Sequence, residues 1–271
     1  EDVKIFKHRD TIRLPSPTQN NIDEKKQLRS SLNNQVFKVG IVGDSQAETT
    51  RFRQQLQSLR MHNIDMFVHL GDVVQDDSSM FEWYLNFFRP ISSKLGSYTP
   101  ILYSRGNHDV ESYLKRHSKF SEHPVSTISP NGYYAYNAAG IRFLVLDTAS
   151  TYNSKQTEWL KCEVSSRAWL DAKFRVVLTH IPPFVEYWDP RSWRAGENRW
   201  GYFNREIFVP ILEAAGMDIM FSGHSHVYQR GKRGSSAYVV AGGGGATLER
   251  VGVNSARVEN WNNMYDVTYF G

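Results

Sequence analysis

Six polar side chains with metal-ligand chemistry directly follow strand-like segments of this sequence. They are two carboxylates, one amide and three imidazoles: Asp44, Asp72, Asn107, His180, His224 and His226. Oxygen and nitrogen donors of these kinds suit Mn²⁺, Fe or Zn²⁺. The chain has a single cysteine, Cys162, so neither an internal disulfide nor a closed thiolate zinc site is expected. The donor types therefore predict a metal centre without sulfur ligands.

These donors can meet only if the elements before them share a sheet edge. Apolar runs predict buried strands at 36–42, 66–70, 100–103, 175–178, 218–221, 237–241 and 264–269, and a hairpin at 133–146. Helical spacing predicts helices at 49–60, 80–95, 157–170 and 205–215. Strands that alternate with helices indicate an α/β fold. Because sites in such folds form outside the carboxyl ends of strands, the donors are expected to converge.

The composition is that of a globular protein, with 271 residues, 40% hydrophobic and 22% charged. No apolar run approaches the ~18 residues of a membrane span. The net charge is 32 − 28 = +4, and the basic residues form no stripe, so a nucleic-acid partner is not expected. Residues 1–34 are polar and weakly patterned. We expect them to form an N-terminal extension, followed by one domain over residues 35–271.

Five short blocks carry the six donors. In chain order they are Gly43-Asp44-Ser45-Gln46, Gly71-Asp72-Val73-Val74, Gly106-Asn107-His108-Asp109, Thr179-His180 and Gly223-His224-Ser225-His226. Through these blocks, from about residue 36 to residue 230, the chain resembles the calcineurin-like metallophosphoesterases, most closely their purple acid phosphatase branch. The resemblance implies a four-layer αββα sandwich of two mixed β-sheets flanked by helices, with residues 35–271 as the catalytic domain.

The resemblance also implies a dinuclear centre for two divalent or trivalent metal ions, of Mn, Fe or Zn. Asp72 would bridge both ions. Asp44 and His226 would bind the first metal, and Asn107, His180 and His224 the second. Family members of this kind hydrolyse phosphomonoesters by attack of a metal-bound hydroxide on phosphorus. In that reaction His108 would donate a proton or hydrogen bond, and Asp109 or another nearby carboxylate would orient His108.

Two positions depart from the family pattern. Gln46 stands where much of the family has a histidine ligand of the first metal, and Gln75 stands where purple acid phosphatases have a tyrosine. Gln46 stays a candidate ligand through its amide oxygen, which is a weaker donor than an imidazole. We therefore expect the first metal to be bound loosely or to be lost on purification. We also expect no purple colour, because no tyrosine is placed to give charge transfer to iron.

Candidate substrate contacts lie outside the five blocks. They are Trp188, Arg191 and Arg194 in the aromatic and basic segment after His180, together with Arg105 and Arg230 beside two of the blocks. Aromatic faces and guanidinium groups suit sugar or base stacking and phosphate binding. An ordinary packed surface loop, and structural roles for the two flanking arginines, explain the same residues. The glycine run at 242–245 lacks the Lys and Ser/Thr of a P-loop, which favours a turn over a phosphate cradle.

A phosphorylated small molecule is thus the expected substrate. Two alternatives remain open: a phosphodiesterase acting on nucleotides or lipid headgroups, and a non-catalytic scaffold on a decayed phosphatase fold, which only Gln46 favours. The sequence leaves open the natural substrate, the identity of the metals, the oligomeric state and the completeness of the chain at its ends. Its compartment is also open, with export to the periplasm or the medium slightly favoured over the cytoplasm.

Overall fold

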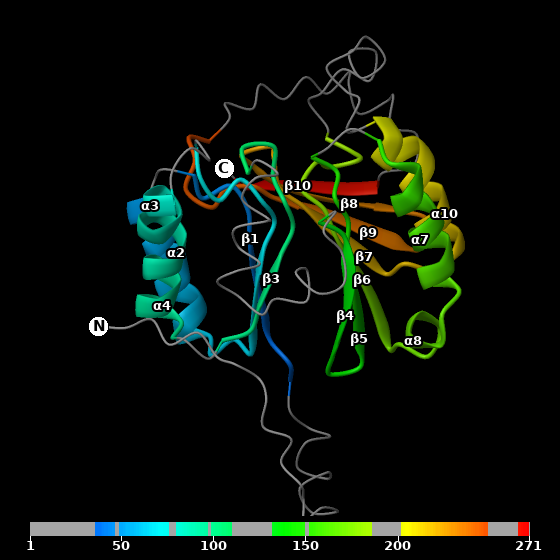
Figure 1. Cartoon of the computed structure of the whole chain (residues 1–271), viewed down its shortest axis with the longest axis horizontal. Helices are drawn as coiled ribbons and strands as arrows, with labels where there is room; N and C mark the ends of the chain where they lie inside the picture. Colours follow the sequence, from blue (N-terminus) through cyan, green and yellow to red (C-terminus); the bar gives the residue numbers. More distant parts are fainter. Residues whose placement is uncertain are drawn as a thin grey trace, which may run out of the picture.

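The chain folds into two β-sheets that face each other, with helices on the outer side of each sheet (Figure 1). The computed structural model describes residues 36–46, 49–75, 80–96, 99–109, 132–149, 152–185, 202–248 and 265–270. The arrangement is the predicted four-layer αββα sandwich. The N-terminal extension expected over residues 1–34 lies outside the described residues.

The smaller sheet contains three parallel strands in the order β1-β2-β3. β1 is Val39–Val42, β2 is Met66–His69 and β3 is Ile101–Tyr103. The helices of this half are α2 (Thr49–Met61), α3 (Met80–Trp83), the π-helical turn η1 (Tyr84–Phe88) and α4 (Arg89–Lys94). Because the three strands run parallel, the residues after each of them emerge at one edge of the sheet.

The larger sheet is mixed and has seven strands in the order β10-β8-β9-β7-β6-β5-β4. Their bounds are β4 Tyr134–Ala138, β5 Ile141–Val145, β6 Phe174–Leu178, β7 Ile219–Ser222, β8 Tyr228–Arg233, β9 Ser236–Ala241 and β10 Tyr265–Phe270. Strands β5, β6, β7 and β9 run parallel to one another. The pairs β4–β5, β8–β9 and β8–β10 are antiparallel. The parallel centre of this sheet again gathers strand ends at one edge.

The helix predicted over residues 157–170 is two helices in the structure, α7 (Ser154–Val164) and α8 (Arg167–Leu170). The break falls at Ser166, whose hydroxyl oxygen accepts the Trp169 N–H at 3.2 Å and caps α8. The helix predicted over residues 205–215 begins with a π-helical turn, η2 (Asn204–Phe208), and continues as α10 (Val209–Ala214). Among the described residues, no helix combines the length and the apolar character that crossing a bilayer requires.

Strand β8 was not predicted, because its sequence YQRGKR is polar and shows no strand-like apolar run. It forms because backbone ladders hold it on both sides, to β9 and to β10. Its side chains alternate between buried and exposed, and Gln229 is buried whereas Arg230 is exposed. Tertiary pairing therefore outweighs the weak local propensity of this segment.

Three hydrophobic clusters fill the three spaces between the layers. Strand β2 shows how they arise, because successive side chains of a strand point to opposite faces. Phe67 packs outward with the α2 residues Phe52 and Leu56, whereas Met66 and Val68 pack inward against the larger sheet. The third cluster lies between the larger sheet and its helices; it includes Leu144, Leu160, Trp169, Phe208, Leu212 and Met220. Each fully buried large side chain contributes about 1.5–3 kcal/mol, so the strands that carry the site are firmly held.

Candidate metal centre

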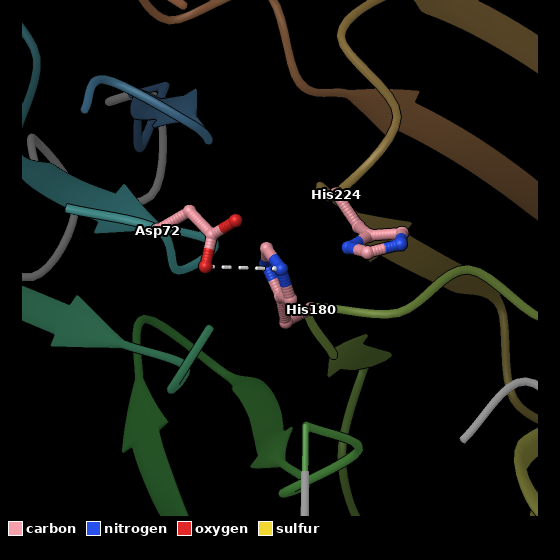
Figure 2. Close-up of side chains that lie close together, drawn as sticks. All are labelled: Asp72, His180 and His224. Carbon is pink, nitrogen blue, oxygen red and sulfur yellow. Dashed lines mark ion pairs between the residues drawn. The ribbon is translucent and has the colours of Figure 1, made fainter. Parts of the chain in front are cut away.

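Four of the predicted ligands converge where the two sheets meet. Asp72 follows β2, Asn107 follows β3, His180 follows β6 and His224 follows β7. Figure 2 shows Asp72, His180 and His224 pointing toward one another, and one ligand atom of each lies within 4.8 Å of the others. The side-chain oxygen of Asn107 lies 3.0 Å from Nε2 of His180 and 2.7 Å from Nδ1 of His224. The loops after four different strands thus build one cluster.

His180 is oriented as a metal-binding imidazole should be. Its ring is fully buried, and Nδ1 donates to the carbonyl oxygen of Leu70 at 2.8 Å. This hydrogen bond directs Nε2 toward Oδ1 of Asp72, at 3.3 Å, and toward Oδ1 of Asn107. Such an outer hydrogen bond fixes both the ring orientation and the tautomer of a ligating histidine.

The electrostatics of the cluster favour a positive charge at Nε2 of His180. Burial opposes the charged ring, but the charge and hydrogen bond of Asp72, the charge of Asp44 and the hydrogen bond to Leu70 together raise the pKa of His180 to about 9. Burial also opposes the charged form of Asp72, yet the charge of His180 and the hydrogen bond with it lower the pKa of Asp72 overall. The charge of Asp72 thus makes the electrostatic potential at this point negative, which favours a bound cation. The donor atoms of Asp72, Asn107, His180 and His224 therefore fit the predicted second-metal site.

Asp44 and His226 lie together beside this cluster. Nε2 of His226 is 3.7 Å from Oδ1 of Asp44, while its Nδ1 donates to the carbonyl oxygen of Thr247 at 2.9 Å. The carboxylate of Asp44 accepts the backbone N–H of His224 at 2.9 Å. Burial, with the charge of Asp72, raises the pKa of Asp44 well above its usual range. A cation beside Asp44 would offset that burial, which fits the predicted first-metal pair.

Gln46 lies buried in the loop after β1, and its backbone N–H donates to the carbonyl oxygen of Asp72 at 3.1 Å. The backbone bond ties the loop that carries Asp44 to the loop that carries Asp72. Metal binding through the Gln46 amide stays a prediction.

The backbone at the ligands adopts a conformation that L-residues rarely take. Asp44, Asp72 and His224 have positive φ values of 61°, 52° and 67°. Each such residue costs about 1–3 kcal/mol and persists only where the surroundings over-determine it. Here backbone hydrogen bonds provide the constraint, as in the bond from the Asp44 N–H to the Gly71 oxygen at 2.9 Å. The strained backbone aims these side chains into the cluster.

His108 lies at the open side of the centre, with one third of its side chain (33%) exposed. Its backbone N–H donates to Oδ1 of Asp72 at 2.8 Å, and its Nε2 lies 3.9 Å from Oδ2 of the same carboxylate. Nδ1 of His108 donates to the backbone carbonyl of Gln75 at 2.9 Å. The orienting contact on the His108 ring therefore comes from Gln75.

The carboxylate of Asp109 makes other hydrogen bonds than the predicted one to the His108 ring. Its buried carboxylate accepts the backbone N–H groups of Val73 and Gly106, at 3.0 and 2.9 Å, and the hydroxyl of Tyr103 at 2.7 Å. These bonds hold the two ligand loops together instead of orienting the His108 ring. Burial and the charge of Asp72 raise the pKa of Asp109 to about 6.

The structure describes two of the predicted substrate contacts, Arg105 and Arg230. Arg105 is buried and pairs with Asp147 at 2.7 Å, which supports the structural role that the sequence left open. Phosphate contact by Arg105 stays a prediction. Arg230 is exposed on β8, on the opposite side from the buried Gln229. The remaining candidates, Trp188, Arg191 and Arg194, lie outside the described residues.

Sequence reasoning missed two residues that support the centre. His69 is fully buried; its Nδ1 accepts the Gly71 N–H at 3.2 Å, and its Nε2 lies 3.1 Å from the Ser45 hydroxyl. The hydroxyl of Thr148 accepts the backbone N–H of His180 at 3.2 Å. For His69 the one available signal was a polar residue inside an apolar strand just before Gly71, whereas no sequence signal marks Thr148.

The four-layer sandwich, with a cluster of oxygen and nitrogen donors at strand ends, is a metallophosphoesterase-type fold with a candidate metal centre. The sequence profile of the calcineurin-like phosphoesterase family matches residues 37–228. The chain belongs to the calcineurin-like phosphoesterase family.

Two curated relatives are plant purple acid phosphatases. Purple acid phosphatase 22 of Arabidopsis thaliana is 28% identical over 205 residues, which cover 71% of this chain and 45% of that protein. Purple acid phosphatase 18 of the same plant is 29% identical over 181 residues, which cover 61% of this chain and 39% of that protein. The matched part thus spans less than half the length of these relatives. They support the resemblance to the purple acid phosphatase branch.

Solved structures agree on the fold. Purple acid phosphatase PPD1 from yellow lupin (Lupinus luteus) seeds superposes with a TM-score of 0.61 at 18% identity, over 81% of this chain and 46% of that chain. GAP50, the anchor in the inner membrane complex of Plasmodium, gives a TM-score of 0.58 at 17% identity, over 80% and 75% of the two chains. At these identities the likeness establishes the architecture alone.

Proposed function

We propose that this protein is a metal-dependent phosphoric ester hydrolase that holds two metal ions and hydrolyses phosphomonoesters. The observation that carries the proposal is the convergence of Asp72, His180 and His224, with ligand atoms within 4.8 Å of one another, beside a partly exposed His108. Membership of the calcineurin-like phosphoesterase family supports phosphoric ester chemistry. The plant purple acid phosphatases among the relatives support monoesters as the first substrate class.

The proposed ligands divide into two sets that share Asp72. Asn107, His180 and His224 would hold the second metal, and Asp44 with His226, joined by Gln46 as a candidate, would hold the first. Metal ions held there supply Lewis acidity, which stabilises charge on phosphoryl oxygens and lowers the pKa of water. The hydrogen bonds from His180 to Leu70 and from His226 to Thr247 leave the Nε2 atom of each ring available as a ligand.

His108 has the place and the chemistry of a proton donor. Its contact with the Gln75 carbonyl and its backbone bond to Asp72 hold the ring at the exposed side of the cluster. In the protonated ring, Nε2–H donates to a phosphoryl oxygen or to the leaving-group oxygen. General acid catalysis of this kind contributes about 10²–10⁴-fold to rate. Asp109 acts as a positioning residue, since it holds the loop that carries His108.

The test combines metal analysis with activity. Protein supplied with Mn²⁺, Zn²⁺ or iron should bind two metals and hydrolyse p-nitrophenyl phosphate, and His108→Ala should keep both metals but lose about 10²–10⁴-fold in rate. His62→Ala is a matched control, because His62 is exposed at the end of α2. Absence of monoester hydrolysis with each of these metals would refute the proposal.

The same assay separates the alternatives. Faster hydrolysis of bis(p-nitrophenyl) phosphate than of the monoester would indicate a phosphodiesterase. Two bound metals without turnover of either ester would indicate a scaffold.

A further inference from the structure

The segment after β9 touches both proposed ligands of the first metal. We name residues 242–247 the glycine strap. The backbone N–H of Ala246 donates to the backbone oxygen of Asp44 at 2.9 Å. The carbonyl oxygen of Thr247 accepts Nδ1–H of His226 at 2.9 Å. One short segment therefore holds two ligands that come from different sheets, since Asp44 follows β1 and His226 precedes β8.

Backbone hydrogen bonds fasten the glycine strap to both loops. The N–H of Gly244 donates to the oxygen of Gly43 at 2.8 Å, and the N–H of Gly242 donates to the oxygen of Val227 at 3.1 Å. On the outer side, the amide of Gln55 on α2 donates to the oxygen of Gly243. Hydrogen bonds thus join the strap to the loop after β1, to the residue before β8 and to helix α2.

Close backbone packing explains why the strap contains glycine. A Cβ atom on Gly242 would lie 2.0 Å from the oxygen of Ser225, and one on Gly244 would lie 2.1 Å from the oxygen of Gly43. Both contacts are with backbone atoms of ligand-bearing loops, which cannot turn aside as a flexible side chain can. Gly243 differs, because among the described residues its Cβ atom would meet only Cδ2 of Leu248, at the ordinary distance of 3.7 Å.

A phosphate cradle is the other reading of a glycine run, and the contacts argue against it. An anion site needs backbone N–H groups that point at the ligand. The N–H groups of Gly242, Gly244 and Ala246 already donate to protein carbonyls. These three N–H groups are therefore not available to bind an anion.

We infer that the glycine strap positions the first-metal ligands and sets the affinity for that metal. Thr247 fixes the tautomer of His226, so that Nε2 carries the lone pair on the side of Asp44. Ala246 fixes the backbone of Asp44. The inference rests on the proposed two-metal function. Its residues are positioning residues, and loss of such outer partners typically weakens metal binding 10–100-fold.

The decisive variant is Gly244→Ala, whose methyl group forces the strap away from Gly43. We expect affinity for one of two Zn²⁺ ions to fall 10–100-fold, with the other affinity unchanged, in calorimetric titration of the apoprotein. Gly243→Ala adds the same methyl group one residue earlier, where there is space, and should bind both ions as the wild type does. Circular dichroism and thermal unfolding show whether each variant is folded.

A second variant keeps the inference testable if Gly244→Ala does not fold. Gln55→Ala removes the hydrogen bond from α2 to Gly243 without adding atoms. It should lower the affinity for the same Zn²⁺ ion several-fold. Gln57→Ala is the matched control on the same helix, because the Gln57 side chain accepts from Lys94 and not from the strap. Native affinity for both ions in Gly244→Ala and in Gln55→Ala would overturn the inference.

The readout separates this inference from the proposed function. Two Zn²⁺ ions bound without ester hydrolysis would contradict the proposed activity, and the variants would still show whether the strap governs the first metal. A wild-type protein that binds a single ion at saturating Zn²⁺ would overturn the inference directly.

Discussion

Replacing Arg105 by methionine tests whether this side chain supports the fold or contacts the substrate. Its guanidinium donates to Oδ2 of Asp147 at 2.7 Å, and the two side chains retain only 10% and 5% of their exposure. Methionine has a similar length and packs in the same space, but it removes the cation beside a buried carboxylate. We therefore expect the variant to lose stability.

The size of the loss follows from the burial of the pair. Removing one partner of a buried ion pair costs about 3–5 kcal/mol. The lower end applies, because Nε of Arg105 is buried and has no hydrogen-bond partner among the described residues, so the native pair is incompletely satisfied. In a domain of this size each kcal/mol lowers Tm by about 2–4 °C. The expected fall in Tm is thus roughly 6–12 °C.

Thermal unfolding of Arg105→Met, Asp147→Asn and the double variant measures the effect. The double variant should recover part of the lost stability relative to Arg105→Met, because it no longer buries the carboxylate charge. KM for p-nitrophenyl phosphate should stay unchanged in Arg105→Met at a temperature where the variant is folded. An unchanged Tm with a KM raised about tenfold, equivalent to ~1.4 kcal/mol of binding energy, would refute this reasoning and make Arg105 a substrate contact.

Three further predictions concern the metal centre and its support. Burial lowers the pKa of His69 to about 3 in the folded protein, whereas the pKa in the unfolded chain is about 6.5. Between these two pH values His69 is protonated in the unfolded chain and neutral in the folded protein. The free energy of unfolding therefore falls as the pH falls. The loss between pH 7.5 and pH 5 should be about 2 kcal/mol in chemical denaturation, and His69→Phe should reduce it. An iron-loaded sample should lack a visible tyrosine-to-iron charge-transfer band, because Gln75 occupies the tyrosine position. Gly106→Ala should lower the metal content in elemental analysis, because its Cβ atom would lie 2.1 Å from Oδ1 of Asp72, the carboxylate that both proposed sites share.

A specific result would contradict each of these three predictions. Equal pH dependence in the wild type and in His69→Phe would show that another group controls acid stability. A visible absorption band in the iron-loaded protein would show that a different tyrosine reaches the metal. Full metal content in a folded Gly106→Ala protein would show that the loop around Asp72 yields more readily than its packing indicates.

Much of the architecture could be predicted because it depends on local signals. The strand β2 and the helix α2 follow from short-range apolar patterns, and the glycine and donor residues after each strand mark the edge where a site forms. The convergence of Asp72, His180 and His224 was expected on that ground, and the structure brings them together. Strand β8 was not predicted, because its sequence is polar and its pairing with β9 and β10 depends on backbone hydrogen bonds.

The supporting contacts of the centre could not be predicted, for a physical reason. The partner of Arg105 lies 42 residues away in the chain, and a distant ion pair has no local signature. The carbonyl groups of Gln75 and Thr247 orient His108 and His226 through backbone atoms, which every residue type possesses. Residue types and their order therefore indicate which chemistry the chain can carry. The packing of the two sheets determines how each ligand is held, because hydrogen bonds between distant backbone groups exist only once the chain is folded.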